Sequence, residues 1–379
     1  MKVVAAIDSF KGSLSTFQAG NAVKDGVKNV YPDAEVKISP LADGGEGTVE
    51  AIIEAMDGKM ESIDVCGPSG EKVRAEYGIV QSTKTAIIEM ASAAGITLVI
   101  PEKRNPLYTT TYGVGEMIAD ALHKGCRNFI VGIGGSATND GGFGMLSALG
   151  IEFLDKNGKP IALGAKGLET LAEIRTDKLM TELKESHFCI ACDVKNPLCG
   201  DNGCSAVYGP QKGADPQIIK DMDGWLKNYA KLTKTVCTHA DENYPGTGAA
   251  GGMGFAFLAY LNSELKSGID IVIEATQLEK YIKDADVVVT GEGRLDGQSY
   301  MGKAPVGVAK LAKKYGKLVV AFSGCVTEDA VNCNDHGIDA FFPILRQPCT
   351  LDEAMDISHA YANLKDTATQ VFKLIKTLK

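Results

Sequence analysis

Five glycine-rich loops hold the residues best suited to chemistry, and the clearest of them runs from Gly132 to Gly142. An apolar stretch, residues 128–131, precedes this loop and predicts a buried strand. Glycines allow a positive φ and let a ligand approach backbone N–H groups, which is how proteins bind phosphate. The loop therefore predicts a phosphate site. Its candidate binding residues are Gly134, Gly135, Ser136, Thr138, Asn139 and Asp140.

The same loop lacks one known phosphate-binding pattern and matches a second only in its loose form. No Gly-Lys-Ser/Thr follows at the spacing of a P-loop, whereas Gly132-x-Gly134-x-x-Ala137 satisfies the loose dinucleotide pattern. Asp140 and the glycines after it lie where a dinucleotide fold needs the first turn of its helix. These residues count against hydride transfer, which nevertheless stays an open alternative at this point.

The other four loops are residues 8–13, 43–48, 246–254 and 291–303. The first and the last mix cations, acids and hydroxyls, residues 43–48 hold acids and a hydroxyl, and residues 246–254 are mainly glycine with one hydroxyl. A sixth segment of similar character, residues 193–200 and 208–213, holds Asp193 and Lys212. Cations and backbone N–H groups suit phosphate, whereas acids in the same place repel it unless Mg²⁺ lies between. Phosphoryl transfer needs that mixture and a carboxylate that accepts the alcohol proton. The acids of all these segments include Asp8, Glu46 and Glu292. The other candidates are Ser9, Lys11, Ser13, Asp43, Gly44, Gly45, Asp193, Gly291, Gly293, Arg294, Asp296 and Lys303.

The elements that must position these loops follow a parallel-sheet style at both ends of the chain. Apolar runs predict strands at 3–7, 35–39, 286–290, 318–322 and 340–344, and a helix capped by Ser13 or Ser15 follows the first. Between them, residues 61–65 and 72–80 alternate as in an antiparallel pair. These patterns predict an α/β protein. A flavodoxin-like, doubly wound parallel-sheet domain, residues 1–57 plus 265–379, is interrupted by an inserted α/β domain, residues 58–264.

The composition of the 379 residues excludes several function classes. The net charge of −9 and the pI near 5.2 argue against a nucleic-acid partner or an anionic membrane surface. No run of 18 apolar residues is free of charge, and we expect residues 1–8 to form the first strand and not a signal peptide, because their apolar run ends at Asp8. We therefore expect a cytoplasmic protein. Its ten cysteines include Cys189-x-x-Cys192, but two residues three apart on one strand face opposite ways, which argues against zinc.

The loops together resemble the type-1 bacterial glycerate kinases, in the order of that family's motifs and over the whole chain. The similar segments are Asp8-Ser-Phe-Lys-Gly-Ser13, Ala42-Asp-Gly-Gly-Glu-Gly-Thr48, the loop from Gly132 to Gly142, Asp193-Val-x-Asn-Pro-Leu198, Gly209-Pro-Gln-Lys-Gly-Ala214, Gly248-Ala-Ala-Gly-Gly252, Thr290-Gly-Glu-Gly-Arg-Leu-Asp-Gly-Gln-Ser299 and Gly302-Lys-Ala-Pro305. The resemblance implies phosphorylation of D-glycerate with ATP and Mg²⁺, and substrates between the two domains. It implies 2-phosphoglycerate as the first choice of product, with 3-phosphoglycerate as the alternative.

With that resemblance, each candidate receives an expected role. We expect ATP phosphates against the loops 132–142 and 291–303, with Lys11 and Lys303 neutralising the γ-phosphate. Arg294 either shares that task or binds the glycerate carboxylate through two parallel contacts. Asp193 is the first choice for accepting the alcohol proton or holding Mg²⁺. Asp43, Asp140 and Asp296 are the other metal candidates.

Two further interpretations of the same residues remain open. Separately, we expect the protein to be a monomer or a homodimer. An NAD-type oxidoreductase is supported only by the partial dinucleotide pattern. A non-catalytic sensor of nucleotide or glycerate would be expected to lose the acids and lysines of the loops, and here they are all present.

Overall fold

A computed structural model describes residues 1–10, 12–41, 48–297, 299–301 and 303–378. The chain forms two compact units. Unit 1 comprises Met1–Asp43, Glu50–Met56 and Ile269–Lys379, and unit 2 comprises Gly44–Val49 and Asp57–Gly268. The predicted domains, 1–57 plus 265–379 and 58–264, stay a prediction, because dense contacts within a unit do not show that it folds alone.

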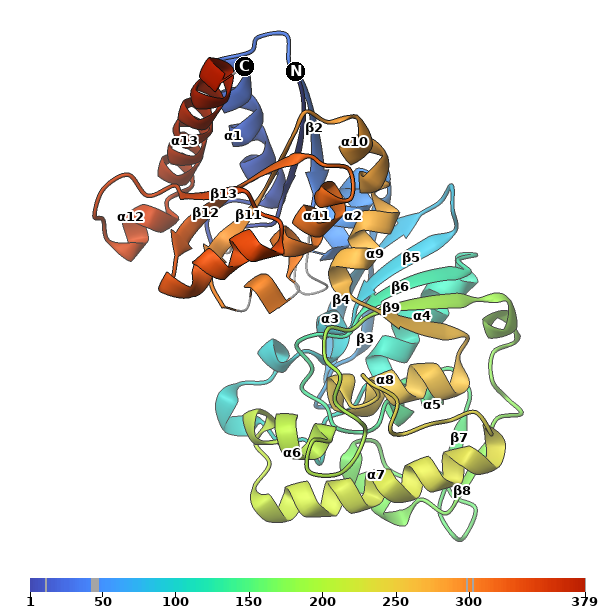
Figure 1. The fold of residues 1–379 in the computed structure, drawn as a ribbon. Helices are drawn as coiled ribbons and strands as arrows, with labels where there is room; N and C mark the ends of the chain where they lie inside the picture. Colours follow the sequence, from blue (N-terminus) through green and yellow to red (C-terminus); the bar gives the residue numbers. More distant parts are fainter. Residues whose placement is uncertain (11, 42–47, 298, 302, 379) are drawn as a thin grey trace. The chain divides into compact units, whose positions relative to one another are not determined.

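Unit 1 is built on a five-stranded parallel sheet with the order β2-β1-β11-β12-β13 (Figure 1). Its strands are β1 (Lys2–Ile7), β2 (Glu35–Pro40), β11 (Val287–Leu295), β12 (Leu318–Val326) and β13 (Ala340–Pro343). Numbered along the chain, this is the 2-1-3-4-5 order of flavodoxin-like sheets. The predicted fold class is confirmed.

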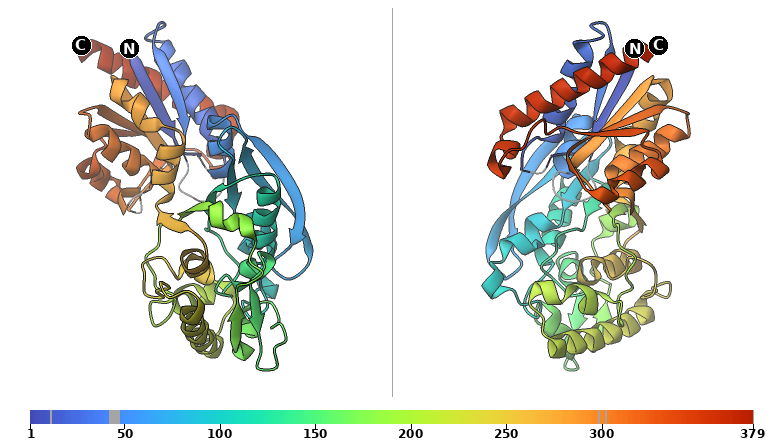
Figure 2. Two further views of the ribbon diagram at one scale, coloured as in Figure 1. Left: turned by 90° about the vertical axis from the view of Figure 1, so that its right-hand side faces the viewer. Right: turned by 60° about the vertical axis from the view of Figure 1, so that its left-hand side comes forward.

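Helices cover both faces of this sheet, as a doubly wound fold requires. α1 and α13 pack side by side on one face, with Val23 and Phe372 in the same apolar core as Val289, while α10 and α11 lie on the other (Figures 1 and 2). The chain's two ends lie near each other in this unit. The helices are α1 (Thr16–Lys28), α9 (Gly268–Ala275), α10 (Leu278–Asp284), α11 (Ala304–Lys313), α12 (Leu351–Met355) and α13 (Ile357–Leu378), with 3₁₀ turns at Ser299–Met301 and Glu328–His336.

The first turn of α1 shows which of the two predicted residues, Ser13 or Ser15, caps this helix. The Ser15 hydroxyl accepts a hydrogen bond from the Gln18 N–H, and the Gln18 side chain accepts one from the Ser15 N–H. This reciprocal capping box satisfies two backbone donors that have no partner within the helix. Ser15 is the cap, and Ser13 is left in the loop that follows β1.

One predicted loop is partly a strand. We expected strand residues 286–290 followed by a loop from Gly291, but β11 continues to Leu295 and pairs with β12 as far as Val326. The prediction was wrong at this point because the neighbouring strand is equally long and pairs with β11 beyond Gly291, at Glu292, Arg294 and Leu295. Gly291 has a φ of +155°, and a Cβ there would lie 1.9 Å from the Phe322 carbonyl oxygen.

Unit 2 is built on a six-stranded mixed sheet with the order β10-β9-β6-β5-β4-β3. Four strands run parallel, and β3 and β4 form the predicted antiparallel pair at one edge. The strands are β3 (Lys59–Cys66), β4 (Lys72–Val80), β5 (Thr85–Glu89), β6 (Asn128–Gly132), β9 (His187–Ala191) and β10 (Ser263–Lys266), beside a small pair, β7 (Glu152–Leu154) and β8 (Glu173–Arg175).

The helices of unit 2 share one apolar core with its sheet, in which Phe129 and Phe188 stack on adjacent strands with ring centroids 4.5 Å apart. They are α3 (Ala91–Ala94), α4 (Tyr112–His123), α5 (Phe143–Ala148), α6 (Cys204–Tyr208), α7 (Pro216–Val236) and α8 (Ala249–Tyr260). Helix α2 (Thr48–Ala55) spans the boundary between the two units, and 3₁₀ turns lie at Ile96–Leu98, Pro101–Lys103, Ala165–Thr170, Thr181–Glu185 and Pro210–Lys212.

Two expected absences concern membranes and metals. Within the described ranges, none of the helices is long and apolar enough to cross a membrane. The ten cysteines form no disulfide. We expected Cys189 and Cys192 to lie on one strand, but β9 ends at Ala191 and Cys192 is the first residue after it.

Candidate active site

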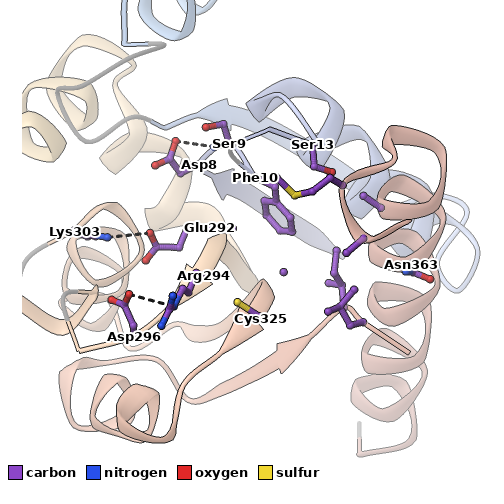
Figure 3. A pocket seen from close by; sticks show the side chains of 17 residues that line it. Asp8, Ser9, Phe10, Ser13, Glu292, Arg294, Asp296, Lys303, Cys325 and Asn363 are labelled. Atoms are coloured by element: carbon purple, nitrogen blue, oxygen red, sulfur yellow. Dashed lines mark hydrogen bonds and ion pairs between the residues drawn. The ribbon is translucent and has the colours of Figure 1, made fainter. Parts of the chain in front are cut away.

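The first candidate site is a cavity of about 340 Å³ in unit 1, at the carboxyl edge of its sheet (Figure 3). In flavodoxin-like sheets, ligands bind where the strand order reverses, which here is between β1 and β11. The Asp8 N–H donates a hydrogen bond of 2.9 Å to the Gly291 carbonyl and ties the ends of these two strands together. The cavity therefore lies at the position that the fold uses for ligands.

Two nearly buried carboxylates lie at this strand reversal. Asp8 is 7% exposed and Glu292 is 8% exposed. The Ser299 hydroxyl donates to one Glu292 oxygen at 2.5 Å, and the Lys303 Nζ lies 3.8 Å from the other. The Ser9 N–H donates to the Asp8 carboxylate at 2.7 Å. Burying two carboxylates is costly unless cations or hydrogen bonds offset the charge, and Lys303, Ser299 and the Ser9 N–H supply such contacts here.

The cations of the cavity are held from two elements. Lys303 is the N-cap of α11, and Pro305 in the first turn supplies the backbone angle that a helix start needs. Arg294 projects from β11 with Nε 3.6 Å from the Asp296 carboxylate, and its side chain is well exposed. The lysine therefore faces Glu292, while the exposed arginine pairs with Asp296 beside it (Figure 3).

This donor set fits Mg²⁺ in the way that kinases usually hold it. Mg²⁺ takes one or two protein carboxylates and completes its shell with water and substrate phosphates, rather than with an all-protein cage. Asp8, Glu292 and Asp296 offer carboxylates on one cavity wall. Among the described residues, no group of three or more acids, histidines or cysteines could hold a metal ion by itself. An open site that needs phosphate oxygens is consistent with both observations.

The structure brings many of the predicted residues together here. Those that line the cavity are Ser9, Ser13, Gly293, Arg294, Asp296 and Lys303. Gly291 joins the ends of β1 and β11 through its carbonyl. The Ser13 hydroxyl oxygen is buried without a hydrogen-bond partner among the described residues.

The second candidate site is the carboxyl edge of the parallel strands in unit 2. Gly132 of β6 pairs with Ala191 of β9, so the loops that follow these strands leave the sheet side by side. Gly134 and Gly135 are exposed in the first loop, and Asp193 is exposed in the second. The Gly268 N–H, at the start of α9, donates to the Asp193 carboxylate at 3.1 Å. An exposed carboxylate and open backbone thus share one edge.

The deeper part of the loop from Gly132 to Gly142 faces the interior of unit 2. The Asp140 carboxylate accepts hydrogen bonds from the N–H and hydroxyl of Thr111, both at 2.9 Å, and from the Gly142 N–H at 3.0 Å. Thr111 and Gly142 are the N-caps of α4 and α5. Burial raises the pKa of Asp140 although these bonds favour its charged form. This network favours a structural role for Asp140 over the predicted magnesium one.

Asn139 and Thr138 are fully buried as well. The Asn139 amide donates to the Ser205 hydroxyl at 2.8 Å, so it joins its loop to α6. Another glycine loop supports the same segment, since a Cβ on Gly251 would lie 2.1 Å from the Thr138 carbonyl oxygen. The glycines at 246–254, one of the five loops considered for chemistry, thus allow close packing. The helix after β6 begins only at Phe143, too late for the dinucleotide pattern at Gly132.

Lys212 is a buried cation whose hydrogen bonds hold the loop from Gly132 to Gly142 in place. Its side chain is 2% exposed, and its Nζ donates to the Ser136 hydroxyl at 2.8 Å and to the Thr138 carbonyl at 2.6 Å. Burial lowers the pKa of Lys212 from 10.5 to about 8. The lysine therefore holds the loop on which Gly134 and Gly135 are exposed.

The lowered pKa of Lys212 predicts a pH dependence of stability. Between pH 8 and 10.5 the unfolded chain keeps this proton while the folded chain loses it, so stability rises with pH over this window. We expect wild-type protein to gain up to about 3 kcal/mol relative to Lys212→Met across it. Denaturant unfolding at several pH values measures this, with exposed Lys220→Met as the control. Parallel curves for wild type and Lys212→Met would contradict the assignment.

Some site residues fall outside these observations. Lys11, Asp43, Gly44 and Gly45 lie outside the described residues, so their predicted roles stay predictions. Sequence reasoning counted Asp8 and Glu292 among the loop acids without giving them a role. Their signal was available, because each follows the buried part of a strand of the central sheet. The apolar residues that line the cavity had no signal of this kind, since they come from segments far apart in the sequence.

Fold and sites together define a two-unit α/β protein with a charged ligand cavity at the strand reversal of a doubly wound sheet. The glycerate kinase family model matches residues 3–376. The chain is 48% identical over 375 residues to a glycerate kinase of Haemophilus influenzae, covering 99% of both, and 50% identical over 365 residues to glycerate 2-kinase of Escherichia coli, covering 96% of this chain and 95% of the relative. A crystal structure assigned to glycerate kinase 2 of Salmonella typhimurium LT2 superposes with a TM-score of 0.92 and 46% identity, covering 100% of this chain and 98% of the other.

The chain belongs to the glycerate kinase family. The resemblance seen in the sequence is confirmed, and the oxidoreductase alternative is wrong because the family and the late start of α5 both oppose it.

Proposed function

We propose that this protein phosphorylates D-glycerate with ATP and Mg²⁺ and releases 2-phosphoglycerate and ADP. The observation that carries the proposal is the cavity at the strand reversal, where Asp8, Glu292 and Lys303 combine acids and a cation. That mixture is what phosphoryl transfer uses, since its catalysis is mainly positioning and charge stabilisation. The relative from Escherichia coli named glycerate 2-kinase supports the choice of product.

In this proposal, Lys303 and Arg294 bind phosphate oxygens at the cavity. Lys303 is already directed at the charged end by Glu292, and Arg294 offers a two-pronged contact to an oxyanion. One or two of the carboxylates of Asp8, Glu292 and Asp296 would hold Mg²⁺, which supplies neutralising charge to the phosphates when it is bound. Ser299 keeps Glu292 oriented through its hydroxyl, and the Asp296 N–H donates to that hydroxyl at 3.1 Å.

Asp193 accepts the proton of the glycerate hydroxyl in the same proposal. It is exposed at a strand end, and the Gly268 N–H fixes one of its oxygens. Gly134 and Gly135, whose loop leaves the neighbouring strand, present exposed backbone that binds an anion. Their loop is held from below by Lys212, so the backbone is ordered before a ligand arrives.

An assay of the purified protein tests the reaction and its product. D-glycerate, ATP and Mg²⁺ are supplied, and the product is presented to enolase alone and to enolase with phosphoglycerate mutase. We expect a signal with enolase alone, which identifies the 2-phosphate. A signal that needs the mutase would identify the 3-phosphate instead. No signal in either case from folded protein would overturn the kinase proposal, and omission of Mg²⁺ should abolish the signal.

We also propose a cytoplasmic enzyme that acts without nucleic acid or membrane partners. Its negative net charge would repel both nucleic acid and anionic lipid. We further propose that the protein is a monomer or a homodimer. Light scattering coupled to size-exclusion chromatography measures the molar mass that distinguishes these two states.

A further inference from the structure

The cavity of unit 1 has two chemically different ends. The charged side chains gather on one side of it in Figure 3, while the Phe10 ring points toward its middle. The remaining wall is apolar and comes from four separate segments. Its residues are Phe10 after β1, Cys325 in β12, Ile344 and Leu345 after β13, and Ala354 and Met355 in α12. A cavity used only for phosphate and glycerate would have no need of this wall.

The apolar wall is partly open to solvent. Phe10 and Ile344 are buried and form its floor, whereas Leu345 is 38% exposed and Met355 is 37% exposed at its rim. Helix α12, which carries Met355, buries none of its own side chains. The methyl group of Met355 lies against the loop after β1, since a Cβ on Gly12 would lie 2.5 Å from it. The rim is thus apolar, and a ligand that covered it would remove that surface from water.

The chemistry of the substrates decides which of them fits this wall. D-glycerate carries oxygen on each of its three carbons and has no apolar face. The nucleobase of ATP is planar and aromatic, and aliphatic side chains and methionine sulfur pack well against such rings. The cavity volume of about 340 Å³ falls within the range of about 300–1,000 Å³ that holds ligands much larger than a three-carbon acid.

We infer that the apolar wall formed by Phe10, Cys325, Ile344, Leu345 and Met355 is the subsite for the purine base of ATP. This inference rests on the proposed function and adds the orientation of the nucleotide. The base lies between Met355 and Cys325, and the triphosphate extends from it toward Glu292 and Lys303 along the same cavity. Unit 1 therefore binds the whole nucleotide.

A charge at the rim tests the subsite through the Michaelis constants. Met355→Glu places a carboxylate against the base, and we expect at least a tenfold rise in KM for ATP with less than a twofold change in KM for D-glycerate. Leu351→Glu is the matched control, since Leu351 lies on the same helix, is 75% exposed and does not line the cavity. It should change neither constant by more than twofold. An active Met355→Glu enzyme with an unchanged KM for ATP would overturn the subsite and leave the kinase proposal intact.

A second measurement uses the wild-type protein and does not depend on the folding of a variant. Cys325 and Cys349 are both exposed, but only Cys325 lines the cavity. We expect ATP or adenosine, without D-glycerate, to slow alkylation of Cys325 by iodoacetamide at least fivefold and to leave Cys349 unchanged, as read by peptide mass spectrometry. Protection by tripolyphosphate but not by adenosine would overturn the base subsite. Protection by adenosine in a protein that phosphorylates no glycerate would keep the subsite and refute the proposed function.

Discussion

Replacement of Asp193 by asparagine should lower kcat by about 10²–10⁴-fold, the usual contribution of a general base. The side chain keeps its size, and its amide oxygen still accepts the Gly268 N–H, which donates at 3.1 Å in the wild type. The negative charge and the ability to take up a proton are lost. Because the residue is exposed, stability should change little, so the variant separates chemistry from folding.

The same variant distinguishes the two roles that the sequence left open for Asp193. If the carboxylate accepts the alcohol proton, the acidic limb of the pH–rate profile disappears and the dependence on Mg²⁺ concentration stays as in the wild type. If it holds Mg²⁺, raising the Mg²⁺ concentration restores part of the rate. The exposed Asp201→Asn, in the same unit, is the matched control and should keep wild-type turnover. Full turnover by Asp193→Asn would remove the residue from the mechanism.

The sequence was sufficient for the central sheet because its strands are strongly marked. Residues 3–7 and 287–290 are unbroken runs of apolar or β-branched residues, which is the pattern of parallel strands buried on both faces. The two ends of the chain share this style, and that likeness predicted one sheet made from both. The pairing register and the length of each strand were harder to predict from the sequence. The continuation of β11 through Gly291 and Gly293 depends on the partner strand β12, which no local pattern of these glycines reveals.

Site residues could be predicted from the sequence where their role follows from the type of side chain. They could not be predicted where the role depends on whether the side chain is buried. Lys303, Arg294 and Asp296 were chosen for their charges, and all three line one cavity. Asp140 was chosen on the same ground, but its carboxylate satisfies the starts of α4 and α5 inside unit 2. A buried acid that caps helices and an exposed acid that binds a ligand look alike in a glycine-rich loop. Only the surroundings separate them.

Lys303→Met should lower kcat/KM by about 10²–10³-fold, the usual cost of removing one preorganised group that stabilises transition-state charge. Lys303 is the N-cap of α11, and its Nζ lies 3.8 Å from Glu292 at the charged end of the cavity. Methionine keeps the length of the side chain and removes its charge. The loss should fall mainly on kcat, because the charge on the transferred phosphoryl group is greatest in the transition state.

Stability gives an independent reading of the same change. The Lys303 side chain is 32% exposed, and an ion pair of that exposure contributes only about 0–1 kcal/mol. We therefore expect the unfolding midpoint to move little while activity falls. Lys310→Met, an exposed position on the same helix, is the matched control for the loss of one positive charge and should retain full kcat/KM. If Lys303→Met kept more than half of the wild-type kcat/KM, the lysine would be no more than a partner for Glu292, and the phosphate would have to be neutralised by other groups.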